Sequence, residues 1–189
     1  GTLVPPVGYL ERLREICDRH GILLVFDEVI TGFGRTGTAF AAESFGVRPD
    51  IMTMAKAITN AAQPMSAVAV DERIYDTVVQ SAPEEAIEFF HGYTYSGHPA
   101  ACAAGIVVQD IYEREGVFAR GAAMAPYFQE RLFALKDIPV VTDVRGYGMM
   151  GGIDVAPDGP VGHRGLATTK RFWEAGLHVK FTGDAGIIA

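Results

Sequence analysis

The sequence predicts an α/β fold in which a mostly parallel sheet has helices on both faces, followed by a smaller α+β unit. Two aliphatic runs each end abruptly on a charged residue, "ILLVF" before Asp27 and "DIMTMA" before Lys56. Helix-like segments alternate with these runs, as in α/β layering. After Pro139 apolar and polar residues alternate, which is typical of antiparallel strands.

In the first half of the chain, apolar periodicity predicts the helices and strands, and glycines predict where they end. Within residues 6–21, apolar side chains at 9, 10, 13, 16 and 17 recur at helical spacing, and Gly21 predicts the end of that helix. The unbroken apolar run at 22–26 predicts a strand covered on both faces of a parallel sheet. Glycines at 32, 34 and 37 indicate a loop. The next expected elements are a short helix at 39–46, strands at 50–55 and 66–71, and a helix at 72–80.

The second half begins with a polar, acidic stretch at 81–88 that predicts a surface loop. A Gly/Pro-containing loop then leads into an Ala-rich helix ending near 115, and a further helix is expected over 117–135. The remaining expected elements are antiparallel strands within 140–156, a helix at 165–176 and a strand at 177–181.

Composition narrows the class of protein. The 189 residues are 49% hydrophobic and 21% charged, with a net charge of −7, which suits a folded domain and argues against nucleic acid as a partner. No apolar run approaches the roughly 20 residues that span a bilayer, so no membrane partner is expected. Two isolated cysteines favour a reduced, cytoplasmic setting. Because the chain starts at Gly1 and stops within the strand-like "GDAGIIA", we expect a fragment of a longer protein.

The acids Asp27 and Glu28 have three chemical interpretations: ligands of a phosphate-bound magnesium, a partner for a cationic cofactor ring, or a structural salt bridge. Aliphatics followed by Asp-Glu resemble the Walker B strand of P-loop nucleotide hydrolases. That alternative function requires a G-x-x-x-x-G-K-[ST] loop, and the chain contains no Gly-Lys pair. The sequence predicts no metal site elsewhere, since its five histidines lack metal-ligand spacing.

Lys56 differs from the other three lysines because it follows a predicted strand. In open α/β sheets, ligands bind beyond the carboxyl ends of the strands, where Asp27 is also expected. A lysine in apolar surroundings has its charged form disfavoured and becomes an amine nucleophile. An ion pair between Lys56 and Asp27 is an equal alternative at this point.

An amine at one strand end and a carboxylate at the next match the needs of pyridoxal 5'-phosphate. This cofactor binds a lysine covalently and needs a carboxylate to keep its ring nitrogen protonated. A charge pair about 4 Å apart is worth roughly 4 kcal/mol at an effective dielectric near 20. Asp27 supplies that charge, whereas an asparagine would not.

Three segments carry a family resemblance: "LLVFDEVITGFGRTGTAFAAESFGVRPDIMTMAK", "AIEFFHGYTYSGHPAACAAG" and "VRGYGMMGGIDVAP". They resemble class III (omega) aminotransferases, most closely the β-alanine–pyruvate branch. The resemblance implies a fold type I enzyme, with residues 1–136 as part of the large cofactor-binding domain and 137–189 as part of the small C-terminal domain. It also implies transamination between an amine donor and a keto acid such as pyruvate, and a homodimer with active sites shared across the interface.

The same resemblance implies roles for individual residues. Asp27 would pair with the pyridinium nitrogen, and Val29 would pack against one face of the ring. Lys56 would bind the cofactor and then move a proton between substrate and cofactor. Thr94 would bind the cofactor phosphate of the partner subunit, although from the residues alone its hydroxyl would be read as a turn cap. The resemblance also implies that the chain is a C-terminal-half fragment, and the isolated chain is expected to be incomplete for catalysis.

The chain departs from the family pattern at three places. Ala61 and Ser66 stand where many relatives carry glycine, and small side chains should fit there. Lys180 stands where relatives commonly place an arginine that pairs with a substrate carboxylate, and lysine lacks the planar two-pronged donor set. Glu28 and Arg35 are expected to brace the loop after the first strand rather than to contact substrate.

Overall fold

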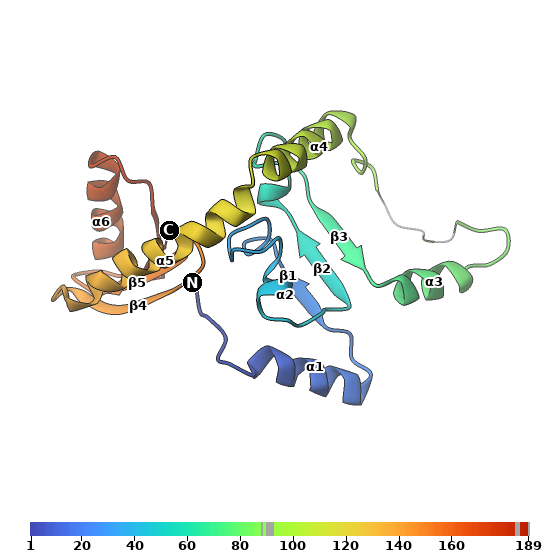
Figure 1. The fold of residues 1–189 in the computed structure, drawn as a ribbon, viewed down its shortest axis with the longest axis horizontal. Helices are drawn as coiled ribbons and strands as arrows, with labels where there is room; N and C mark the ends of the chain where they lie inside the picture. Colours follow the sequence, from blue (N-terminus) through green and yellow to red (C-terminus); the bar gives the residue numbers. More distant parts are fainter. Residues whose placement is uncertain (88, 90–92, 184–185, 189) are drawn as a thin grey trace. The chain divides into compact units, whose positions relative to one another are not determined.

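A computed structural model describes residues 1–87, 89, 93–183 and 186–188 (Figure 1). Part of the "HGYTYSGHP" motif, His91 included, lies outside the described residues. The chain forms two compact units. We call them the Lys56 unit, Gly8–Phe33 with Ala39–Val117, and the Lys180 unit, Gly1–Val7 with Gly34–Thr38 and Phe118–Ala189. The domain boundary at 136/137 stays a prediction, because compactness within this chain does not define the domains of a longer protein.

The Lys56 unit alternates helices and strands, as the sequence predicts. Its elements are α1 (Tyr9–His20), β1 (Val25–Asp27), α2 (Ala41–Ser44), β2 (Ile51–Met54), the 3₁₀ turn η1 (Lys56–Ile58), β3 (Ala67–Val70), α3 (Glu72–Gln80) and α4 (Pro99–Arg114).

Helix α1 ends where the sequence predicts and covers one face of β1. Gly21 adopts the left-handed conformation, φ 64°, which lets the Ile22 N–H donate to the Cys17 carbonyl at 2.9 Å and closes the helix. Cys17 and Leu24 are buried in the small core of this unit, against which Phe26 packs. Apolar burial therefore holds α1 on one side of the strand.

The sheet has the order β1-β2-β3, with β1 and β2 parallel and β2 and β3 antiparallel. Successive side chains of a strand point to opposite faces, so Phe26 faces the core while Val25 faces the other way and is 51% exposed. Within the described residues, one face of this strand is therefore open. In Figure 1, α4 lies beside the end of β2 at which Lys56 follows.

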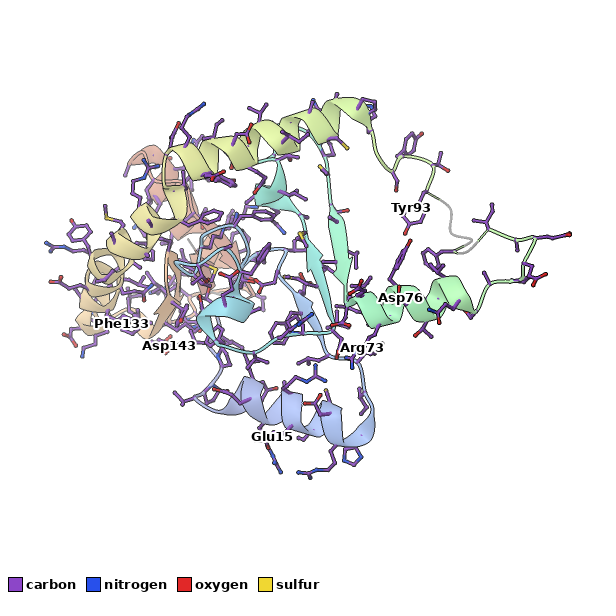
Figure 2. The ribbon with its side chains drawn as sticks, turned by 45° about the vertical axis from the view of Figure 1, so that its right-hand side comes forward. Glu15, Arg73, Asp76, Tyr93, Phe133 and Asp143 are labelled. Atoms are coloured by element: carbon purple, nitrogen blue, oxygen red, sulfur yellow. The ribbon has the colours of Figure 1, made fainter. Side chains whose placement is uncertain are left out.

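Asp50 lies at the opposite end of the same sheet and joins three elements. Its carboxylate accepts hydrogen bonds from the backbone N–H of Leu24 and from Arg14 of α1, both at 2.8 Å. It is also paired with Arg73, which lies at the start of α3 (Figure 2). Two hydrogen bonds to the charged carboxylate hold the pKa of Asp50 below its ordinary value of 3.8. The bond from the Leu24 N–H has the larger effect, and the bond from Arg14 comes second. Asp50 is only 6% exposed, so this ion pair is largely shielded from water.

The Lys180 unit is an antiparallel sheet with helices, which confirms the alternating pattern after Pro139. Its sheet has the order β4-β5-β7-β6. Val155, Val179 and Ile187 form its buried core. The elements are α5 (Val117–Phe133), η2 (Ala134–Asp137), β4 (Val141–Tyr147), β5 (Met150–Val155), α6 (His163–Glu174), β6 (Lys180–Thr182) and β7 (Gly186–Ile188).

An ion pair between neighbouring strands reinforces this sheet. Arg145 of β4 contacts both carboxylate oxygens of Asp154 on β5, at 2.8 and 3.1 Å. The guanidinium lowers the pKa of Asp154 by hydrogen bonding to its charged form. Among the described residues, no helix has the length and apolar character that crossing a bilayer demands.

Candidate active site at the strand ends

The two chemically distinctive residues, Asp27 and Lys56, lie at the carboxyl ends of adjacent parallel strands. Asp27 is the register partner of Thr53 on β2, and the Glu28 N–H donates to the Thr53 carbonyl at 2.9 Å. Lys56 follows β2 by two residues and opens the turn η1. The parallel pairing therefore brings both residues to the same edge of the sheet, as the strand assignments predict.

Asp27 presents a carboxylate that is held in place but only partly used. One oxygen, Oδ1, accepts a hydrogen bond from the backbone N–H of Val29 at 3.0 Å. The side chain is exposed on the face of the sheet that α1 leaves open. Within the described part of the chain no hydrogen bond is made to the second oxygen, so that oxygen can accept a proton donor from a ligand.

Lys56 is not an ion-pair partner of Asp27. Among the residues that the structure describes, no salt bridge joins the two side chains, so the purely structural alternative loses its support. Lys56 is exposed, and the expected apolar surroundings are therefore not found within this chain. Its amine is thus available to a ligand rather than committed to a neighbouring carboxylate.

The backbone of Lys56 adopts the left-handed conformation, φ 48°, which is unusual for a residue with a side chain. This conformation costs about 1–2 kcal/mol relative to the right-handed region. Asn60 and Ala61 in the same turn also have positive φ, 48° and 60°. The N–H of Ala61 donates to the Lys56 carbonyl at 3.2 Å and closes the turn. Strained residues of this kind concentrate at functional sites.

Glu28 is a structural residue, as the sequence analysis expects. Its side chain is 2% exposed and accepts hydrogen bonds from the backbone N–H groups of Ala41 at 3.1 Å and Ala42 at 2.7 Å. It also accepts from the hydroxyl of Thr31. Glu28 therefore fixes the loop that follows Asp27 to the start of α2, and its oxygens are used within the protein.

Thr94 lies in a different part of the Lys56 unit, in the turn that leads into α4. It is exposed and lines a cavity of about 740 Å³ together with Ser66, Ser96 and His98. Among the described residues the Thr94 hydroxyl makes no turn-capping hydrogen bond, unlike His98, whose Nδ1 accepts from the Ala101 N–H at 3.4 Å. Hydroxyls beside the N-terminus of a 16-residue helix suit an anionic group such as a phosphate. Lys56 does not line this cavity.

The other predicted residues are placed as follows. Val29 is half-buried, and its N–H orients Asp27. Lys180 is exposed at the start of β6, an edge strand of the Lys180 unit. Arg35 belongs to the same unit, where its carbonyl accepts from the Met149 N–H at 2.8 Å.

Sequence reasoning missed two residues of α4 that contact the Lys56 turn. The hydroxyl of Tyr112 donates to the Ala57 carbonyl at 2.8 Å, and Nε2 of Gln109 donates to the Ile58 carbonyl at 3.1 Å. The three-residue spacing of Gln109 and Tyr112 places them on one face of the helix. The sequence shows that spacing, but it does not show that this helix face contacts the turn after Lys56.

Comparison with known proteins connects this geometry to a family. The model of the class-III aminotransferase family matches residues 1–188. The chain is 52% identical over 186 residues to the beta-alanine–pyruvate aminotransferase of Pseudomonas aeruginosa, covering 97% of the chain and 42% of that protein. It is 51% identical to the omega-amino acid–pyruvate aminotransferase of Pseudomonas putida, covering 97% and 41%. The chain thus spans about two fifths of the length of these relatives.

Solved structures of transaminases also resemble this chain. A transaminase with L-alanine superposes with a TM-score of 0.93 at 33% identity, over 100% of the chain and 46% of that structure. The (S)-enantioselective omega-transaminase from Thermomicrobium roseum gives a TM-score of 0.88 at 39% identity, over 100% and 42%. None of these matches supports a P-loop nucleotide hydrolase.

Proposed function

Because this chain belongs to the class III aminotransferase family, we propose that the protein containing it transfers an amino group from an omega-amino acid or amine to a keto acid such as pyruvate. Pyridoxal 5'-phosphate is the proposed cofactor, because both the aminotransferase relatives of this chain and the chemistry of Asp27 and Lys56 suit it. The observation that carries the proposal is the exposed, mutually unpaired Asp27 carboxylate and Lys56 amine at adjacent strand ends.

The residues fit the cofactor by their chemistry. When bound, pyridoxal phosphate supplies an electron-accepting ring that stabilises the charge left after a substrate proton is removed. Asp27, oriented by the Val29 N–H, would hold a proton at the ring nitrogen through its available oxygen. The side chain of Val29 would pack against the ring. Lys56 would bind the cofactor and afterwards accept and return the substrate proton at Nζ.

Thr94 is proposed to bind the cofactor phosphate that belongs to a partner subunit. The hydroxyl-lined cavity at the start of α4, which Lys56 does not line, supports this. A homodimer with shared active sites follows as part of the proposal. The two unpaired cysteines favour a cytoplasmic location. We infer that the 189-residue chain alone is incomplete for catalysis.

The test is to load the intact protein with pyridoxal phosphate, reduce it with borohydride and map the modified peptide. The expected result is one adduct, on Lys56, that Lys56→Ala abolishes and Lys136→Ala leaves intact. Lys136 is a suitable control because it lies in η2, in the other unit. An adduct on a different residue, or none, overturns the assignment.

Lys180 is the proposed contact for a substrate carboxylate. A single ammonium offers a less directional contact than a guanidinium, so Lys180→Arg should lower KM for pyruvate and β-alanine in the intact enzyme. Lys170→Arg, on helix α6, is the matched control. An unchanged KM for both substrates would remove Lys180 from the site.

A further inference from the structure

Side chains from α4 hold the turn that carries Lys56. Tyr112 and Gln109 donate to the carbonyls of Ala57 and Ile58, the two residues that directly follow Lys56. A bonded carbonyl fixes the orientation of its peptide plane, so these two bonds hold the planes that follow Ala57 and Ile58. The α4 face therefore restrains the turn directly after Lys56, the residue whose amine is proposed to bind the cofactor.

Tyr112 also contacts the loop that follows Asp27. Its ring lies 6.4 Å, centroid to centroid, from the ring of Phe33, and Phe33 in turn packs edge-on against Phe40 at 5.3 Å. Phe33 lies in the same loop as Glu28, whose carboxylate binds the N–H groups of Ala41 and Ala42, so this loop is held both by Glu28 and by the Tyr112 ring. One side chain thus touches both segments that carry proposed cofactor residues.

The two segments share a second property. Lys56 and Phe33 both adopt the left-handed conformation, with φ of 48° and 61°, although neither is glycine. Such conformations persist only when the surrounding structure holds them. Tyr112 is half-buried and contacts both places, through its hydroxyl at the Lys56 turn and through its ring at Phe33.

We propose that Tyr112, with Gln109 in a lesser role, is a positioning residue that holds Lys56 and the loop after Asp27 ready to receive the cofactor. The lesser role of Gln109 follows from its exposure, since water competes for its hydrogen bond. This inference rests on the proposed function. It assigns to Tyr112 no contact with the cofactor or the substrate.

The test compares Tyr112→Phe, which removes the hydroxyl and keeps the ring, with Tyr75→Phe, an exposed tyrosine on α3. In the intact protein loaded with pyridoxal phosphate, we expect Tyr112→Phe to weaken cofactor binding about tenfold, because fewer molecules hold the competent turn. The midpoint pH of the absorbance change of the bound cofactor should move by about one unit. Gln109→Ala should shift both quantities in the same direction but less, and Tyr75→Phe should change neither.

Hydrogen exchange in the protein without cofactor gives a readout that does not depend on the proposed function. The amides of Thr59 and Ala61 donate to the Lys56 carbonyl and should exchange about tenfold faster in Tyr112→Phe. Unchanged exchange, or an unchanged midpoint pH with full cofactor binding, overturns the inference. If the protein never binds the cofactor at Lys56, that result overturns the proposed function instead. The exchange rates of the Thr59 and Ala61 amides then decide separately whether Tyr112 holds the turn.

Discussion

The two ends of the sheet in the Lys56 unit use charged residues in opposite ways. At the amino end, Asp50 is buried and bound to Arg14, Arg73 and a backbone N–H. At the carboxyl end, Asp27 and Lys56 are exposed and form no ion pair with each other. The amino end therefore contributes stability, while the carboxyl end keeps a carboxylate and an amine available to a ligand, at a cost in backbone strain.

The largest effect that separates the two ends is on unfolding free energy. Asp50→Ala should destabilise the Lys56 unit by about 3 kcal/mol, because Arg14 and the Leu24 N–H lose their partner in a nearly buried place. Asp27→Ala should change stability by less than about 0.5 kcal/mol, as at other exposed sites. Urea unfolding of the chain without cofactor measures both, with Asp76→Ala on α3 as the surface control. If Asp50→Ala and Asp27→Ala lowered the free energy of unfolding equally, the two ends of the sheet would not differ in their contribution to stability.

The pH dependence of stability sharpens the same contrast. Hydrogen bonds from the Leu24 N–H and then from Arg14 lower the pKa of Asp50 in the folded chain below 3.8. A lowered folded pKa means that the unfolded state takes up the proton first, so this stability is present above 3.8 and is lost as the pH falls through the folded value. Asp50→Asn should therefore lose less stability between pH 7 and pH 3 than the unsubstituted chain. Asp154, whose pKa is also lowered, remains in both proteins and contributes equally.

The smallest effect concerns strain at the carboxyl end. Ala61 has φ of 60°, which glycine adopts without the clash of a Cβ atom. Ala61→Gly should therefore stabilise the folded chain by up to about 1 kcal/mol, reduced by the extra freedom of glycine in the unfolded state. Gly116→Ala, at φ 59° with open space around the added Cβ, is the mirror-image control and should destabilise by a similar amount. Destabilisation by Ala61→Gly would mean that the turn is not strained there.

The same residue explains a departure noted in the sequence. The family resemblance implies that glycine is common at position 61, and the positive φ of Ala61 is the conformation that favours glycine. Ser66, the second such position, lines the cavity with Thr94, so its hydroxyl adds a polar group to that wall.

By itself the sequence determined the order of helices and strands in both units, the placing of Asp27 and Lys56 after adjacent strands, and, through its motifs, the family. These follow from local signals: apolar periodicity, glycine stops and charged residues that end apolar runs. Only the tertiary structure decided that β3 runs antiparallel to β2, that one face of β1 is open, and that Lys56 and Asp27 are unpaired.

Tertiary structure also revealed Tyr112, 56 positions after Lys56 and yet in contact with its turn. The physical reason is that a contact between distant segments depends on how strands pair and which helix face packs. Neither strand pairing nor helix packing is encoded in the residues near the site alone.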